Sequence, residues 1–327
     1  MKQIPITDIE GFRIGNSENT EAATGCTVII CEKGATAGVD VRGGSPASRE
    51  TELLKPVNTL EKIHAVMLSG GSAFGLEAGD GAMKFLSEKE IGFDTGYGLV
   101  PIVCGASLFD FELVTNKVFP DKEMGYKACE NAFNEKELKE GNVGAGTGAT
   151  VGKLDYCENM MKSGLGIYAS EVGDVKVGAI VAVNALGDVI DYDTKEILAG
   201  LLKPDKSGFA DTVKTMYERI DNNHPIWGGN TSIGCIITNA KLDKSQCNKL
   251  ASIAHNGYAQ TIRPVHTTAD GDTIFVMSTC EVEAGIDAVG ALFTECMARA
   301  VNRAITEAKP AYGLKAYENL VPEGRVF

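Results

Sequence analysis

A threonine that follows two glycines and an asparagine is a candidate nucleophile in this chain. The sequence reads Gly228-Gly229-Asn230-Thr231 and continues as an apolar, strand-like run. If the Asn230–Thr231 peptide bond is cut, Thr231 carries a free α-amine beside its hydroxyl, and an amine with a pKa near 7.7–8.0 can serve as that hydroxyl's base. Before the cut, the hydroxyl can attack the Asn230 carbonyl, since glycines let the backbone bend there. The alternative is a plain threonine at the start of a buried strand.

Two aspartates that flank a glycine form a second candidate group. Asp270 and Asp272 stand just before another strand-like run. Asp-Gly-Asp is a common turn, and a solvated turn is the default interpretation. In strand geometry, however, residues two apart point the same way, so both carboxylates would face one cleft, perturb each other's protonation and hold a hydroxyl or an ammonium group. A calcium loop is excluded, because its glycine and glutamate spacing is absent.

A glycine-rich segment, residues 142–154, ends beside Lys153. It does not fit a Walker A phosphate loop, because Thr147 and Leu154 stand where that motif needs a glycine and a hydroxyl residue. The alternating glycines also do not fit the dinucleotide-binding fingerprint. Two explanations of the glycine density stay open: a flexible loop that delivers Lys153 to a cleft, and tight packing of the backbone.

A second glycine turn, at residues 69–75, joins a strand-like run to a helical one. It is not a nucleophile elbow, because Phe74 stands where that motif needs its second glycine. A glycine turn that opens a helix offers free backbone N–H groups to an oxyanion or a carboxylate. Gly70, Gly71 and Ser72 are therefore weak candidates for substrate binding, with a tight strand–helix turn as the alternative.

The elements around these candidates alternate between strands and helices. The periodicity predicts two strands about a Lys33–Gly34 turn, a hairpin about Gly173–Asp174, and a β-α-β-α order in the last third of the chain. That last third comprises a strand at 232–240, a helix from 244 to about 261, a strand at 273–282 and a helix from about 286 to 309. Exposed loops are expected at 203–208 and 224–230. The pattern favours an α+β or layered α/β architecture in which helices cover apolar sheets.

Composition narrows the function classes. The 327 residues are 44% hydrophobic and 23% charged, with a net charge of −13. Such an acidic chain disfavours binding to nucleic acid or to an anionic membrane surface. No run approaches the roughly 20 apolar residues of a membrane span, and the first residues do not resemble a signal peptide. The nine cysteines and four scattered histidines indicate a reducing, cytoplasmic setting without a metal site.

Eight blocks in order along nearly the whole chain resemble the self-processing DmpA-type L-aminopeptidase/D-esterase family. They include GVDVRGGSPASRETELL, VMLSGGSAFGLEAGDGAMKFL, GAGTGATVGK, VGAIVAVNALGDV, GGNTSIGCIITNAKL and RPVHTTADGDTIFVMST. The Asn-Thr pair and the Asp-Gly-Asp turn bring the chain nearer the branch of endo-type 6-aminohexanoate-oligomer (nylon oligomer) hydrolases than the serine-nucleophile branch.

The resemblance implies a fold and a set of roles. The fold is a four-layer α/β/β/α sandwich of the DmpA/ornithine-acetyltransferase type, formed by a single domain over residues 1–327. Cleavage behind Asn230 would give an α piece, 1–230, and a β piece, 231–327, that assemble into homo-oligomers. Thr231 would be the nucleophile, Asn184 the oxyanion-side asparagine, Lys153 a lysine beside the nucleophile, and Asp270 with Asp272 the pair that orients the threonine.

The expected activity is amide hydrolysis on small peptides or oligoamides, as an aminopeptidase-like enzyme without metal or cofactor. Two alternatives stay open: acyl transfer of the ornithine-acetyltransferase kind, and an unprocessed, non-catalytic homologue. The substrate class is not fixed, since α-L-, β- and D-aminoacyl amides and oligoamides all fit the chemistry. Cys104 and Gly105 depart from the family pattern, which puts substrate choice in doubt more than the chemistry.

Overall fold

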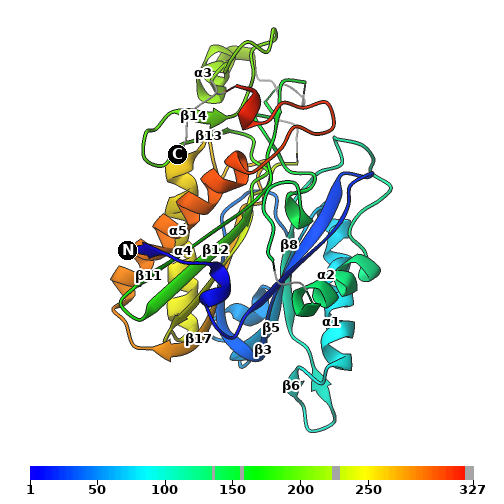
Figure 1. Cartoon of the computed structure of the whole chain (residues 1–327), viewed down its shortest axis with the longest axis vertical. Coiled ribbons are helices and arrows are strands. Elements are labelled where there is room, and N and C mark those ends of the chain that lie inside the picture. The colour runs from blue at the N-terminus through cyan, green and yellow to red at the C-terminus, as the bar shows by residue number, and fades with distance from the viewer. Residues whose placement is uncertain (135–136, 155–157, 223–228, 321–327) are drawn as a thin grey trace.

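The computed structural model describes residues 1–134, 137–154, 158–222 and 229–320 (Figure 1). The strands are β1 (Lys2–Gln3), β2 (Arg13–Asn19), β3 (Thr24–Val41), β4 (Ala47–Arg49), β5 (Lys62–Ser69), β6 (Phe93–Asp94), β7 (Leu99–Val100), β8 (Val103–Ser107), β9 (Thr150–Val151), β10 (Met161–Lys162), β11 (Leu165–Val172), β12 (Val175–Ala182), β13 (Asp188–Ile190), β14 (Ile197–Ala199), β15 (Ile233–Ala240), β16 (Ile262–Arg263) and β17 (Thr273–Val282). The α-helices are α1 (Ala78–Glu88), α2 (Lys122–Asn134), α3 (Thr212–Glu218), α4 (Lys244–Thr261) and α5 (Ile286–Thr306).

One strand, β3, links the two halves of the main sheet. The strand order is β1-β11-β12-β15-β17-β3-β5-β8-β4, with β2 paired to β3 beside this path. The first part of β3 pairs with β2 and β5, and its last part, Thr36–Val41, pairs with β17. The predicted turn at Lys33–Gly34 is therefore wrong. Partners on both sides carry the chain through as one strand, and Gly34, at φ +73°, accommodates the irregularity between Ile30 and Ala35 in the pairing with β5.

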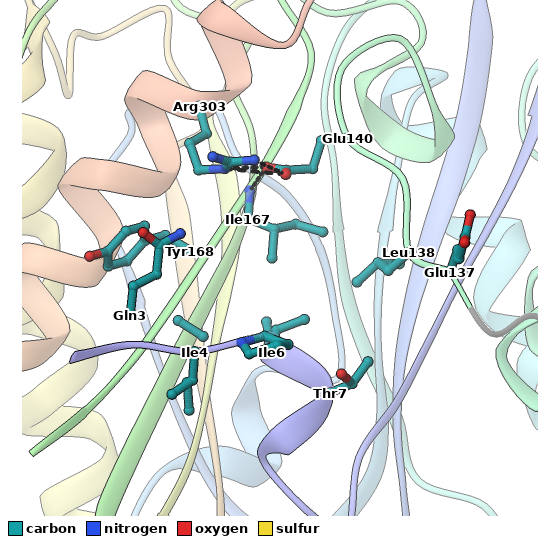
Figure 2. Close-up of a pocket in the computed structure, with 12 residues that line it drawn as sticks. Gln3, Ile4, Ile6, Thr7, Glu137, Leu138, Glu140, Ile167, Tyr168 and Arg303 are labelled. Atoms are coloured by element: carbon teal, nitrogen blue, oxygen red, sulfur yellow. Dashed lines mark hydrogen bonds and ion pairs between the residues drawn. The ribbon is translucent and has the colours of Figure 1, made fainter. Parts of the chain in front are cut away.

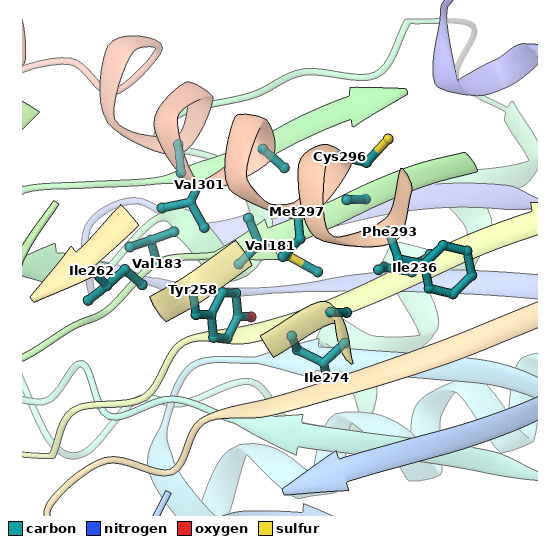
Figure 3. Close-up of a cluster of buried hydrophobic side chains, with 14 of the residues drawn as sticks. Val181, Val183, Ile236, Tyr258, Ile262, Ile274, Phe293, Cys296, Met297 and Val301 are labelled. Carbon is teal, nitrogen blue, oxygen red and sulfur yellow. The ribbon is translucent and has the colours of Figure 1, made fainter. Parts of the chain in front are cut away.

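Three separate apolar cores show that the sheet is folded onto itself. Along β15 the side chains alternate, so that Cys235 and Ile237 join a core against β5 and β8 while Ile236 faces α4 and α5. The core below α4 and α5 is drawn in Figure 3, where Tyr258 and Phe293 lie among aliphatic side chains of the strands. A third core lies between β3, β5, β8 and the helices α1 and α2. Helix, sheet, sheet and helix therefore form four layers, as the resemblance implied, and Figure 1 shows α4 and α5 on the side opposite α1 and α2.

The last third of the chain confirms the predicted β-α-β-α order. Strand β15, helix α4 and strand β17 form a crossover unit whose two strands are parallel, with Ile233 opposite Thr273. Helix α4 begins at Lys244, as predicted, because Asp243 and Gln246 form a capping box there. The predicted hairpin about Gly173–Asp174 is also present, between β11 and β12.

Glycine brings helix α4 close to the sheet. A Cβ on Gly38 of β3 would lie 2.3 Å from the backbone nitrogen of Asn248 in α4, so no larger residue fits that contact. Among the described residues, no helix combines the length and the apolar character that crossing a bilayer requires.

Candidate active site

The junction between Asn230 and Thr231 is buried. Asn230 has no exposed surface and Thr231 is 4% exposed, so the expectation of an exposed loop is wrong at Asn230, while residues 224–228 lie outside the described residues. The backbone N–H of Thr231 donates to the carbonyl oxygen of Asn184 at 2.8 Å, and the N–H of Gly271 donates to the carbonyl oxygen of Asn230 at 2.9 Å. The hydroxyl of Thr231 donates to that same Asn230 oxygen. The candidate nucleophile therefore lies against the peptide group that precedes it.

Parallel pairing of two strands explains why Asp270 and Asp272 lie beside this junction. Strands β15 and β17 run in the same direction with Ile233 opposite Thr273, so the residues just before each strand meet at the same edge of the sheet. Asn230 and Asp270 form a parallel bridge at that edge. The register of the crossover unit thus brings together two motifs that lie about 40 residues apart in sequence.

The two carboxylates make different contacts. Asp272 accepts the N–H of Ser232 at 2.8 Å, whereas Asp270 accepts the N–H of Thr267 at 2.7 Å. Both aspartates are at least 98% buried. Burial, together with the nearby charge of Asp272, raises the pKa of Asp270 to about 6. The default interpretation of a solvated turn is therefore wrong.

Lys153 and Asn184 are in direct contact. The Lys153 ammonium donates to Oδ1 of Asn184 at 2.6 Å and to the carbonyl oxygen of Gly229 at 3.2 Å, and the side chain has no exposed surface. Oδ1 of Asn184 also accepts the N–H of Thr150, while its Nδ2 donates to the carbonyl oxygen of Phe109 at 2.8 Å. The amide orientation is thus set by donors on one side and an acceptor on the other. This arrangement fixes the polar groups behind the Asn230–Thr231 junction.

The counter-ion of Lys153 is a residue that the sequence did not indicate. Oε1 of Glu112 lies 2.6 Å from the Lys153 nitrogen, and the Glu112 side chain is 11% exposed. Its Oε2 is buried and has no hydrogen-bond partner within the described ranges. Glu112 follows β8 in an irregular segment, so no period or motif marks it in the sequence. The ion pair compensates the charge of a fully buried ammonium.

The glycine-rich segment before Lys153 is held by a second buried lysine. Lys162 donates to the carbonyl oxygens of Gly146 and Ala149, at 3.0 Å each, and also to that of Ser163. Burial lowers the pKa of Lys162 to about 7. The segment therefore packs tightly, and it ends at Lys153, which contacts the carbonyl oxygen of Gly229, two residues before Thr231.

The turn at Gly70, Gly71 and Ser72 has its N–H groups engaged within the protein. They donate to the carbonyl oxygen of Gly25 at 2.9 Å, to Oδ1 of Asp110 at 2.8 Å and to the carbonyl oxygen of Leu108 at 2.8 Å, respectively. Burial raises the pKa of Asp110 to about 6. The turn therefore offers no free backbone N–H from these three residues, but Ser72 lines the cavity in front of Thr231.

That cavity has a volume of about 540 Å³ and is lined in part by Thr231, the candidate nucleophile. Its walls come from segments far apart in the chain: Ser45, Ala47, Ser72, Ser107, Phe109, Gly229, Asn230, Thr231, Thr268 and Ala269. Phe109 packs so closely on Gly229 that a Cβ there would lie 2.0 Å from its ring. A cavity of this volume lies in the range of sites that bind small molecules.

A larger cavity, of about 700 Å³, shares no lining residue with this site. It lies between β1, β11 and residues 137–140, and Figure 2 shows the ion pair of Arg303 with Glu140 on its wall. Gln3, Ile4 and Ile6 line its lower part (Figure 2). The described residues that line this cavity do not combine a hydroxyl, a lysine and two neighbouring carboxylates, as the residues around Thr231 do.

Comparison with known proteins decides the family. The sequence profile described as peptidase family S58 matches residues 5–318. The chain belongs to peptidase family S58. It is accordingly a hydrolase of the peptidase and amidase type, and the resemblance seen in the sequence is confirmed.

Relatives within family S58 carry two kinds of name. An uncharacterized aminopeptidase of Mycobacterium leprae is 36% identical over 357 residues, which cover 97% of this chain and 94% of the relative. A 6-aminohexanoate-oligomer endohydrolase of Paenarthrobacter ureafaciens is 32% identical over 286 residues, covering 84% and 75%. Both alignments extend over most of the chain.

Solved structures of low sequence identity share the fold. The L-aminopeptidase D-Ala-esterase/amidase of Ochrobactrum anthropi, described as a variant of the Ntn hydrolase fold, superposes with a TM-score of 0.69 at 18% identity, covering 96% of this chain and 92% of its own. A β-aminopeptidase from a Burkholderia species superposes with a TM-score of 0.67 at 19% identity, covering 96% and 91%. The four-layer fold is therefore that of the Ntn hydrolase aminopeptidases.

Proposed function

We propose that this S58 peptidase cuts its own backbone between Asn230 and Thr231 and then hydrolyses small peptides or oligoamides with the freed Thr231. The observation that carries the proposal is the contact of the Thr231 hydroxyl with the Asn230 carbonyl oxygen, which also accepts the N–H of Gly271 at 2.9 Å. A carbonyl that already accepts two donors is polarised toward attack. The products would be the 1–230 and 231–327 pieces of one folded unit.

Self-cleavage would proceed through an ester. The Thr231 oxygen forms a bond to the Asn230 carbonyl carbon, the C–N bond breaks, and the nitrogen takes up the hydroxyl proton. Water then adds to the ester carbonyl, which releases the Asn230 carboxylate and restores the Thr231 hydroxyl. The N–H of Gly271 stabilises the negative oxygen of the first step, and losing one such donor typically costs about 100- to 1000-fold in rate.

Hydrolysis of a substrate would use the same groups. The α-amine of Thr231 takes the hydroxyl proton as the oxygen attacks the substrate amide, and returns a proton to the leaving amine. The resulting ester is opened by water. Lys153 and Asn184 place polar groups beside Gly229. On the other side, Asp270 pairs with Asn230 and Asp272 accepts the N–H of Ser232, so both hold the segment that contains Thr231. Asn184 would contribute on the oxyanion side through Nδ2, and its own carbonyl oxygen accepts the N–H of Thr231 at 2.8 Å.

The substrates would be small amides with an aminoacyl or amino-alkanoyl group. The relative from Paenarthrobacter is named for 6-aminohexanoate oligomers, and the mycobacterial relative is named as an aminopeptidase. The cavity of about 540 Å³ at Thr231 accommodates such a group. We further propose a cytoplasmic, homo-oligomeric enzyme; the free state of the eight described cysteines supports a reducing compartment.

Mass spectrometry of the purified protein tests the proposal. We expect two fragments, the second beginning with Thr231, and an uncut chain for Thr231→Ala, with partial or full cleavage for Thr231→Ser. An active preparation that contains only the unbroken 34.6 kDa chain would contradict the proposal. A panel of α-L-, β- and D-aminoacyl p-nitroanilides and 6-aminohexanoate oligomers then identifies the substrate class, and acetyl exchange between N-acetylornithine and glutamate reveals the acyl-transfer alternative.

A further inference from the structure

The carboxylate of Asp272 connects the nucleophile segment to a histidine. One oxygen, Oδ1, accepts the N–H of Ser232 at 2.8 Å, directly after Thr231. The other, Oδ2, accepts the backbone N–H of His266 at 3.1 Å and lies 2.8 Å from the ring Nδ1 of the same residue. Among the described residues, each hydrogen bond to the carboxylate therefore restrains either the segment after Thr231 or His266.

His266 adopts a backbone conformation that directs two donors at one oxygen. Its φ is +57°, in the left-handed region that residues other than glycine seldom adopt. Because a carboxylate accepts and does not donate, Nδ1 must carry the proton of this contact. Residues held in such a conformation concentrate at functional sites, where the surrounding structure over-determines them.

The buried position of Asp272 explains why its carboxylate has a hydrogen-bond donor such as the His266 ring. Asp272 is 1% exposed and lies beside Asp270, whose pKa burial raises to about 6. A buried carboxylate is costly unless it is paired and hydrogen-bonded. Two carboxylates face His266, those of Asp272 and Asp270, and two rings of α4 face it, those of His255 and Tyr258. Asp40 and Arg42 lie on the far side of His255. Of these, Asp272 is the acceptor that the ring contacts.

The helix behind His266 holds its ring without competing for Asp272. The His255 ring lies edge-on, with 4.8 Å between the ring centroids, and its Nε2 contacts the carbonyl oxygen of Asp40 at 3.0 Å. Burial lowers the pKa of His255 to about 4, so its ring is neutral and its Nε2 is engaged by the carbonyl oxygen of Asp40 and not by Asp272. The hydroxyl of Tyr258 is buried with no hydrogen-bond partner in the described part of the chain. These neighbours pack against the imidazole while Nδ1 stays directed at Asp272.

We infer that His266 is a positioning residue for self-cleavage. It fixes the Asp272 carboxylate, which in turn fixes the Ser232 N–H and thereby keeps the Thr231 hydroxyl on the Asn230 carbonyl. This inference rests on the proposed function. It assigns a role to a residue that does not contact the scissile bond. His266 is also not among the residues that line the 540 Å³ cavity.

Variants of His266 separate positioning from general loss of structure. His266→Ala removes the donor, whereas His266→Asn places an amide N–H near the position of Nδ1 and cannot titrate. Tyr258→Phe is the matched control, because it removes from the same cluster a hydroxyl that has no hydrogen-bond partner among the described residues. Full-length chains are made by cell-free synthesis, quenched at intervals and resolved on denaturing gels, and the melting temperature of each folded variant is measured.

We expect His266→Ala to cleave about 10- to 100-fold more slowly, a loss comparable to that of removing a partner that orients a metal-ligating side chain. His266→Asn should recover most of the rate, and Tyr258→Phe should cleave at the wild-type rate. A wild-type rate in His266→Ala overturns the inference, as does a His266→Asn variant as slow as His266→Ala at an equal melting temperature. A wild-type chain that is never cut overturns the proposed function as well, so the two failures are distinguishable.

Discussion

The backbone N–H of Gly271 donates a hydrogen bond of 2.9 Å to the carbonyl oxygen of Asn230. Gly271 is the central residue of the Asp-Gly-Asp turn, so the turn contributes its backbone as well as its two carboxylates. Parallel pairing of β15 with β17 sets this contact, because it aligns the residues that precede both strands. The turn therefore supports the junction at the oxygen that would become negative during cleavage.

Replacing Gly271 by alanine should slow self-cleavage strongly. A Cβ at this position would lie 2.7 Å from Oγ1 of Thr231, closer than real Cβ atoms approach, so the hydroxyl must move. A displacement of about 1 Å in a reacting group can cost roughly 100-fold in rate. We expect a drop of that order, read from the fraction of uncut chain over time. Gly208→Ala, where nothing lies within 4 Å of the added Cβ, is the control and should cleave normally.

The ion pair of Lys153 with Glu112 should contribute to the stability of the folded chain. Lys153→Met leaves the Glu112 carboxylate buried without its partner, and breaking a buried pair costs about 3–5 kcal/mol. Chemical denaturation of the uncut Thr231→Ala background measures this cost. Lys55→Met, which breaks an ion pair whose lysine is 58% exposed, should change the free energy of unfolding far less. Equal losses for the two variants would contradict a buried role for Lys153.

Asp110 should make the stability of the protein depend on pH. Burial raises its pKa from 3.8 to about 6 in the folded protein, so the folded state binds the proton more tightly than the unfolded state. Relative to Asp110→Asn, the wild type therefore loses stability as pH rises from about 4 to about 6, by roughly 3 kcal/mol in total, and the difference stays constant above that range. Asparagine can still accept the N–H of Gly71. Denaturation curves of both proteins from pH 3.5 to 8 measure the difference, and a constant offset across that range would refute the prediction.

Asp270 should set the pH dependence of self-cleavage. Its pKa is raised to about 6, first by burial and then by Asp272, so the carboxylate is protonated below that pH. Because we propose that the charged carboxylate helps to hold the threonine segment, the rate should rise as pH increases through about 6. Asp270→Asn should be slow and should lack that rise. Timed cleavage of freshly synthesised chains between pH 5 and 8 measures both, and an unchanged inflection in Asp270→Asn would assign it to another group.

Local sequence patterns predicted the strands and helices around the candidate site better than the way in which the strands pair and stack. The β15–α4–β17 unit was predictable because the strand runs are apolar and Asp243 with Gln246 marks the start of the helix. The turn at Lys33–Gly34 was predicted wrongly, because pairing of β3 with partners on both sides outweighs the local turn preference. The layered class followed from alternating elements, whereas the stacking of two sheet halves depends on the path of β3.

Residues of the candidate site were predictable from the sequence where they lie in one short motif. Thr231, Lys153, Asp270 and Asp272 each belong to such a motif, and the resemblance added Asn184. Glu112 and Phe109 lie in an irregular stretch after β8, and only the tertiary fold brings them to Lys153 and Gly229. The contacts of His266 likewise depend on its unusual φ angle, for which His-Thr-Thr gives no signal.

The order of strands determines what scission would do to the molecule. Strands β15 and β17 follow residue 230, yet they lie between β12 and β3, which precede it. A nick before Thr231 would therefore leave each fragment hydrogen-bonded to the other along both borders of the inserted pair. We expect the two fragments to stay associated on dilution and to separate only in denaturant. Neither product could be expected to fold when expressed by itself, so a mature enzyme of this kind must be made as one continuous precursor.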